Sequence, residues 1–288
     1  MEKEQNNLGH GLILDVVKPE HYVLGGFGDL PKDVLQADRD WSFFLPVHEP
    51  QSHEGFESYN CTRYGTYHQV AILMKRLFGV NTFPDTDGDY NWSERFGGII
   101  GNTTPNGNSP HSAYDDIRAF GLLDEMFLPF SPDIDSWGEY YSPKPMTQQH
   151  LDKAKGWLSH FDIKYEWVYG ILDGTVEERA EKIWEALQYS PLGVSVYAWK
   201  LNPATGLYIR PAGAASNHWV TLIGGEYKKY FKIFDTYGPF IKIVPWDFDF
   251  ELAKRIHIVK KTVESTVVAP VSFLELILKF LRWIKLIK

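Results

Sequence analysis

The clearest periodic pattern in the chain covers residues 61–78. Its apolar side chains recur at steps of three and four residues, at Tyr64, Tyr67, Val70, Ala71, Met74, Leu77 and Phe78. The polar loop 49–60 precedes this stretch, and Gly79 follows it as a helix stop signal. The pattern predicts a long, half-buried helix with Cys61 at its N-terminus.

The rest of the chain divides into helical patterns followed by strand patterns. Helices are predicted at about 112–120, 147–160 and 176–189. After Pro191, short β-branched and aromatic runs separated by turns predict strands at Gly193–Trp199, His218–Gly224, Tyr230–Asp235 and Phe240–Val244. This order predicts an α+β fold, with a helical half followed by an antiparallel sheet half.

Three regions are predicted from these patterns. Residues 1–37 form an extended lead-in, whose one short apolar run, from Leu12 to Val17, predicts at most one strand. Residues 38–262 form a single two-lobed domain. Residues 263–288 form a linker and a basic amphipathic helix, whose charges recur at Glu275, Lys279, Arg282, Lys285 and Lys288. We expect the helix at 272–288 to dock on a partner protein, another copy of the chain or a membrane surface.

Composition narrows the function classes. The 288 residues are 44% hydrophobic and 23% charged, which is typical of a soluble globular protein. A net charge of −8 without a basic patch disfavours nucleic-acid binding. The polar N-terminus has no signal-peptide pattern, and the single cysteine excludes an intramolecular disulfide. We therefore expect a reducing compartment or a virion-associated protein of viral or microbial origin.

Three residues are candidates for chemistry, although each has an ordinary structural interpretation. A lone cysteine such as Cys61 is most often buried and inert, but a helix N-terminus favours the thiolate and the neighbours of Cys61 are polar. His218 begins an apolar strand, and Asp235 ends another. A carboxylate at the end of a strand, such as that of Asp235, can cap a turn or orient an imidazole.

Taken together, these residues and their surroundings resemble the papain (C1) family of cysteine peptidases over residues 38–260. His218 follows Cys61 by 157 residues, and Asp235 lies 17 residues further on. The matching segments, in chain order, are DWSFFLPVHEPQ ending at Gln51, Cys61, Trp92–Arg95, Asn106–Asn108, Leu128–Phe130, Pro191–Val196, Asn217–Val220 and Asp235–Gly238.

The resemblance implies a peptidase that hydrolyses protein or peptide substrates through a thioester acyl-enzyme. Cys61 would be the nucleophile, His218 its acid–base partner and Asp235 the residue that orients the imidazole. Gln51 would complete the oxyanion hole. Substrate would be bound by Gly107, Asn108, Asn217, Trp219 and Tyr237. The resemblance implies neither a metal nor an organic cofactor.

The chain departs from the family pattern at several positions. The nucleophile stands in Y-N-C-T-R, and Gln51 lies ten residues before it, which requires a loop insertion. Asp235 replaces the family's asparagine, Tyr237 its tryptophan, and Asn108 a glycine. We also expect no inhibitory prodomain of the family's usual length. Two other interpretations stay open: a non-catalytic structural or binding protein on the same fold, or an acyl-transfer enzyme such as an amidase or transpeptidase.

One further segment invites a metal interpretation. In residues 85–91, carboxylate side chains alternate with other residues, as they do in calcium-binding loops. However, Gly88 is at the fourth position of the loop rather than the sixth, and Phe96 stands where a bidentate glutamate is required. A solvated turn is the preferred interpretation, so the sequence predicts no metal site.

Overall fold

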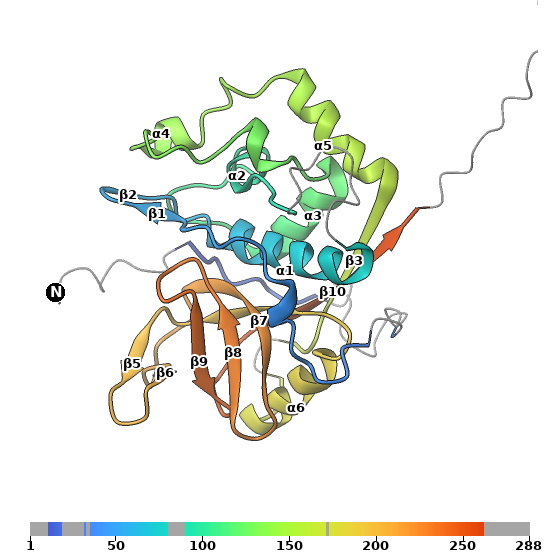
Figure 1. Ribbon diagram of the computed structural model, residues 1–288. Coiled ribbons are helices and arrows are strands. Elements are labelled where there is room, and N and C mark those ends of the chain that lie inside the picture. The colour runs from blue at the N-terminus through green and yellow to red at the C-terminus, as the bar shows by residue number, and fades with distance from the viewer. Residues whose placement is uncertain (1–10, 19–31, 33–34, 80–89, 171–172, 262–288) are drawn as a thin grey trace, which may run out of the picture.

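The computed structural model describes residues 11–18, 32, 35–79, 90–170 and 173–261 (Figure 1). It has the predicted α+β architecture. The central helix α1 (Cys61–Phe78) lies between a helical half and a sheet half (Figure 1). The predicted tail helix at 272–288 lies outside the described residues. Among the described residues, no helix is both long and apolar enough to cross a membrane.

The remaining helices belong mainly to the helical half. They are α2 (Glu94–Ile100), α3 (Pro110–Phe120), α4 (Trp137–Tyr140), α5 (Gln148–His160) and α6 (Val176–Ala186), with 3-10 turns η3 (Ser42–Phe44) and η4 (Glu125–Phe127). The predicted helices at 112–120, 147–160 and 176–189 are confirmed as α3, α5 and α6, with small shifts at their ends. Ser109 caps α3, and Pro110 occupies its first turn.

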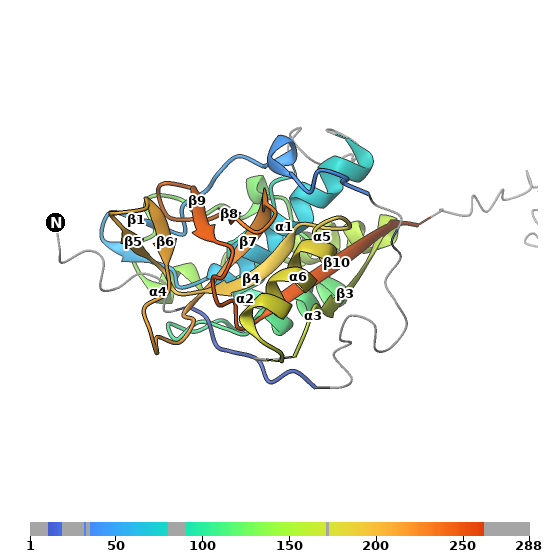
Figure 2. The ribbon, with the colours of Figure 1, turned by 90° about the horizontal axis from the view of Figure 1, so that it is seen from below.

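The strands form one large antiparallel sheet and two small hairpins. The strands are β1 (Ser52–His53), β2 (Phe56–Glu57), β3 (Phe161–Trp167), β4 (Leu192–Val196), β5 (Lys200–Asn202), β6 (Leu207–Ile209), β7 (His218–Glu226), β8 (Tyr230–Phe234), β9 (Ile241–Pro245) and β10 (Ala253–Lys260). The six-stranded sheet has the order β3-β10-β4-β7-β8-β9, and β3 and β10 run side by side in Figure 2.

Helix α1 is more deeply buried than its sequence predicted. Every residue from Cys61 to Met74 is buried, because the helix is covered by the sheet on one side and by the helical half on the other. Its polar side chains are accommodated inside; for example, Gln69 Nε2 donates to the carbonyl of Pro191 at 2.8 Å. Gly65 lets β7 approach closely, because an added Cβ would lie 2.8 Å from the Trp219 ring.

Strands β3 and β10 were not predicted. Their sequences carry charged residues that look solvent-exposed, yet the pair Glu166 and Arg255 is buried in the structure. Here the two side chains satisfy each other across the paired strands, with Arg255 Nε 2.8 Å from Glu166 Oε1. Single-strand periodicity cannot reveal such a pair, because the partner strands lie far apart in sequence.

Candidate active site

Three elements bring the candidate triad to one place. Cys61 opens α1, which packs against β7; the hydroxyl of Thr221 in β7 donates to the carbonyl of Gly65 in α1 at 2.8 Å. His218 is the first residue of β7, and Asp235 directly follows the neighbouring strand β8. The antiparallel pairing of β7 with β8 sets His218 beside Asp235. Cys61, His218 and Asp235, separated by 157 and 17 positions in the sequence, thus meet where β7 begins and β8 ends.

The His218 ring is held by a carboxylate and has the Cys61 thiol as a neighbour. Its Nε2 lies 2.6 Å from Oδ1 of Asp235. Burial by itself would lower the pKa of His218, but the charge and hydrogen bond of Asp235, together with Cys61, raise it to about 9. The imidazole therefore carries a proton at neutral pH, next to the sulfur.

Asp235 has two further buried partners that the sequence did not suggest. Its Oδ2 accepts hydrogen bonds from Trp199 Nε1 and from Lys242 Nζ, both at 2.6 Å. Burial raises the pKa of this carboxyl, but His218 and Lys242 outweigh burial and lower it to about 2. Lys242 lies on the same buried side of β9 as Val244, and that inward position is the one signal that could have revealed it.

The Asp235–Lys242 pair yields a stability prediction. Replacing Asp235 by asparagine leaves the Lys242 ammonium buried without its counter-charge, which is expected to cost about 3 kcal/mol of unfolding free energy. Adding Lys242→Met removes the stranded charge, so the double variant is expected to recover most of the loss. Denaturant unfolding of the two variants measures both effects.

A matched control is Lys232→Met, which removes a lysine from a partly exposed pair with Asp40. Its effect on the unfolding free energy is expected to stay below about 1 kcal/mol. If Asp235→Asn has the same unfolding free energy as the unaltered chain, the prediction for the Asp235–Lys242 pair is wrong.

The insertion between Gln51 and Cys61 is a short hairpin of β1 and β2 that brings Glu57 to the site. Gln51 is fully buried, and its Nε2 donates to Glu57 Oε1 and to the Tyr237 hydroxyl, each at 2.8 Å. Its Oε1 accepts from the hydroxyl of Thr236. Both N–H groups of the amide are therefore engaged, and Gln51 must release one of them to stabilise an oxyanion.

The N-terminal segment 11–18 lies in the cleft beside Cys61. A Cβ added to Gly11 would stand 3.1 Å from the Cys61 sulfur. The segment pairs with Asn108: the N–H of Ile13 donates to the Asn108 carbonyl at 2.9 Å, and the N–H of Asn108 donates to the Gly11 carbonyl at 3.0 Å. Asp15 accepts from the N–H of His111 at 2.8 Å. The strip expected to bind substrate thus already holds an extended chain.

The other expected substrate residues divide between cleft and interior. The Tyr237 ring lies 5.0 Å from the His218 ring, and its hydroxyl donates to Glu57. Asn217 accepts from the N–H of Ala198 at 3.0 Å. Trp219 is buried on the opposite face of β7, where it packs against Gly65 and Gly193. That position does not fit the expected contact with substrate, since successive residues of a strand face opposite sides.

Comparisons with known proteins support the fold. No family model and no curated protein matches the sequence. Among solved structures, xylellain, a cysteine protease from Xylella fastidiosa, aligns with a TM-score of 0.58 at 15% identity over 88% of this chain and 96% of that one. A clostridial cysteine protease, Cwp84, gives 0.53 at 15% identity over 76% and 56% of the two chains, and procathepsin B from Trypanosoma congolense gives 0.51 at 14% over 82% and 79%. The chain therefore has a papain-like fold.

Proposed function

We propose that this protein is a cysteine peptidase that hydrolyses peptide bonds through Cys61, His218 and Asp235. The observation that carries the proposal is the position of His218, which is held by Asp235 and lies next to the Cys61 thiol, two neighbours that raise the pKa of its ring to about 9. A positively charged imidazole beside a thiol at a helix N-terminus favours the thiolate, which is the attacking species.

In the proposed reaction, the Cys61 thiolate attacks the substrate carbonyl carbon. His218 then gives its proton to the leaving amine, and the neutral ring later takes a proton from the water that hydrolyses the thioester. Asp235 keeps the ring oriented. The N–H of Cys61, which has no hydrogen-bond partner within the described residues, is available to donate to the oxyanion.

An extended peptide is the substrate class that the cleft favours. Segment 11–18 is held largely through main-chain groups at Asn108, and such bonds do not depend on side-chain identity. Acyl transfer to an amine would use the same three residues, with the amine in place of water. A non-catalytic binding protein would keep the cleft but would not need a protonated His218 beside the only cysteine.

The pH dependence of Cys61 alkylation tests the proposal. Because His218 stays protonated up to about pH 9, we expect the iodoacetamide rate at about pH 5.5 to stay within about tenfold of the rate at about pH 8. An ordinary thiol, with a pKa of about 8.5, would lose about 200-fold over that range. Protein-cleaving activity should be lost in proportion to the fraction of Cys61 that is alkylated.

Two results would contradict the proposal. One is an ordinary thiol profile in the unaltered chain, which would favour the inert binding protein. The other is an unchanged profile in a His218→Ala variant, which would show that the imidazole does not influence the sulfur. Turnover itself is expected to decline above about pH 9, as His218 loses the proton that it gives to the leaving group.

A further inference from the structure

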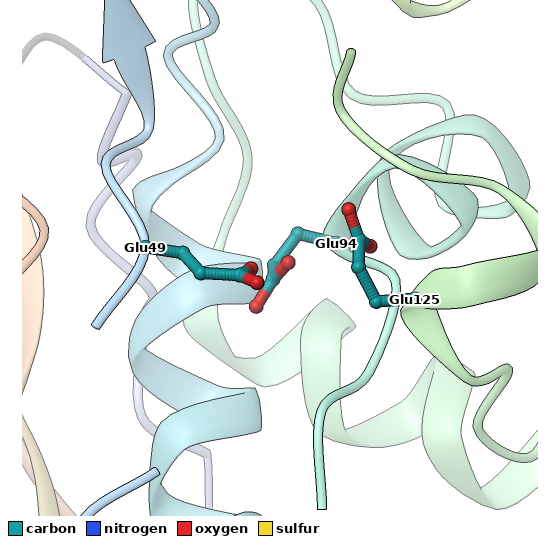
Figure 3. A group of neighbouring side chains, drawn as sticks. All are labelled: Glu49, Glu94 and Glu125. Atoms are coloured by element: carbon teal, nitrogen blue, oxygen red, sulfur yellow. The ribbon is translucent and has the colours of Figure 1, made fainter. Parts of the chain in front are cut away.

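Three glutamates converge in the helical half, apart from the candidate triad (Figure 3). Glu49 comes from the loop before the β1–β2 hairpin, Glu94 is the first residue of α2, and Glu125 opens η4. One carboxylate oxygen of each lies within 4.8 Å of the others, and Figure 3 shows the carboxylates of Glu49 and Glu94 facing each other. Glu94 is only 2% exposed. Three such groups cannot stay ionised together without a neutralising partner.

The hydroxyl of a buried tyrosine indicates that a ligand belongs in this place. Tyr64, one turn along α1 from Cys61, is 1% exposed, and its hydroxyl has no hydrogen-bond partner within the described part of the chain. Buried tyrosine hydroxyls usually have one. Tyr64 lines a cavity of about 250 Å³ together with Glu49 and Glu125. The buried Oε2 of Glu125 also lacks a partner in the described structure.

The basic side chain next to Glu94 in the sequence is directed elsewhere. Arg95 follows Glu94 in α2, but its Nε donates to the carbonyl of Tyr140 and its Nη2 to that of Glu139, both at 3.0 Å. Within the described residues, neither Glu94 nor Glu125 forms an ion pair with a basic side chain. Asn91 Nδ2 donates to Glu49 Oε1 at 2.6 Å, which orients that carboxylate.

We propose that Glu49, Glu94 and Glu125 bind a hard divalent cation, with calcium the best match. Carboxylate oxygens are the ligands such ions prefer, and calcium accepts six to eight oxygens, so waters in the cavity would complete its shell. One of them could bond to the Tyr64 hydroxyl. The ion would join the loop before the hairpin, α2 and η4 into one rigid unit. It would take no part in the chemistry of Cys61. Most of the 85–91 loop considered in the sequence lies outside the described residues.

Thermal unfolding and terbium luminescence test this site in the full-length chain. Relative to EDTA, about 5 mM CaCl2 is expected to raise the melting temperature by about 5 °C. The isosteric variants Glu94→Gln and Glu125→Gln should each lose most of this rise. Glu54→Gln, at the exposed tip of the same hairpin, removes an equal charge and should keep it. Terbium should bind the unaltered chain with luminescence sensitised by nearby aromatic rings, and calcium should displace it.

Two outcomes would overturn the proposal. If calcium neither raises the melting temperature nor displaces terbium, and Glu94→Gln melts at or above the temperature of the unaltered chain, the carboxylates are neutralised by protons instead. If calcium stabilises both glutamine variants as much as the unaltered chain, the ion binds elsewhere. The terbium measurement on the unaltered chain decides the question even if a variant fails to fold.

Discussion

A Gly11→Leu variant is expected to cleave an unfolded protein substrate about 10- to 100-fold faster than the unaltered chain, because segment 11–18 would be expelled from the cleft. An added Cβ at Gly11 would stand 2.3 Å from the carbonyl oxygen of Tyr59, which belongs to the backbone and cannot turn aside. The segment would then lose its hydrogen bonds to Asn108. These two bonds, the bond that Asp15 accepts from the N–H of His111, and the burial of Leu12 are together of the size that this rate gain requires.

Initial rates on a quenched, unfolded protein substrate measure this effect. The matched control is Val16→Ser, since Val16 belongs to the same segment but is 71% exposed. This control should leave the rate unchanged. If Gly11→Leu is no faster than Val16→Ser, either the segment leaves the cleft readily by itself or substrate does not bind where the segment lies.

The segment also shows what the sequence could not reveal about the site. The short apolar run from Leu12 to Val17 predicted at most a strand in the lead-in. Its position depends on a main-chain pairing with Asn108, almost a hundred residues away, and such pairing leaves almost no side-chain signature. This segment also lies against Cys61, which is completely buried.

The elements that position the triad were predictable for a physical reason. Helix α1 and strands β7 and β8 have long apolar runs bounded by glycine or polar turns, so local pattern and tertiary burial agree. The residues that surround Asp235 were not predictable in the same way. Trp199 and Lys242 matter because they converge on one carboxylate, and convergence is a property of the folded sheet.

Gln51 illustrates how an insertion changes the environment of an expected residue. The sequence showed that the loop before Cys61 was longer than the family pattern, but it did not show that the extra residues fold into a hairpin. That hairpin supplies Glu57, whose carboxylate accepts one N–H of Gln51. Burial has the largest influence on the pKa of Glu57 and raises it, although hydrogen bonds from Gln51 and Tyr237 act in the opposite direction. The oxyanion role of Gln51 therefore stays a prediction.

A Cys61→Ala substitution in the Gly11→Leu background is expected to lower protein cleavage by at least about 10⁴-fold, the loss typical of removing a nucleophile. The open background matters, because in the unaltered chain segment 11–18 would mask part of the difference. His218→Ala in the same background should cost a similar factor, since the two residues act as one unit. Combining the two substitutions should therefore add little to either loss.

The same variants distinguish a working triad from a cleft that only binds. Cys61→Ala removes the sulfur without touching Asn108 or the bonds of Asp235 to Lys242, so the fold and the peptide-binding strip should persist. A binding measurement with an uncleaved peptide should give the same affinity for Cys61→Ala as for its parent. Retained cleavage by Cys61→Ala would assign the activity to another group. Additive losses of activity in the double variant would show that His218 and Cys61 do not act as one unit.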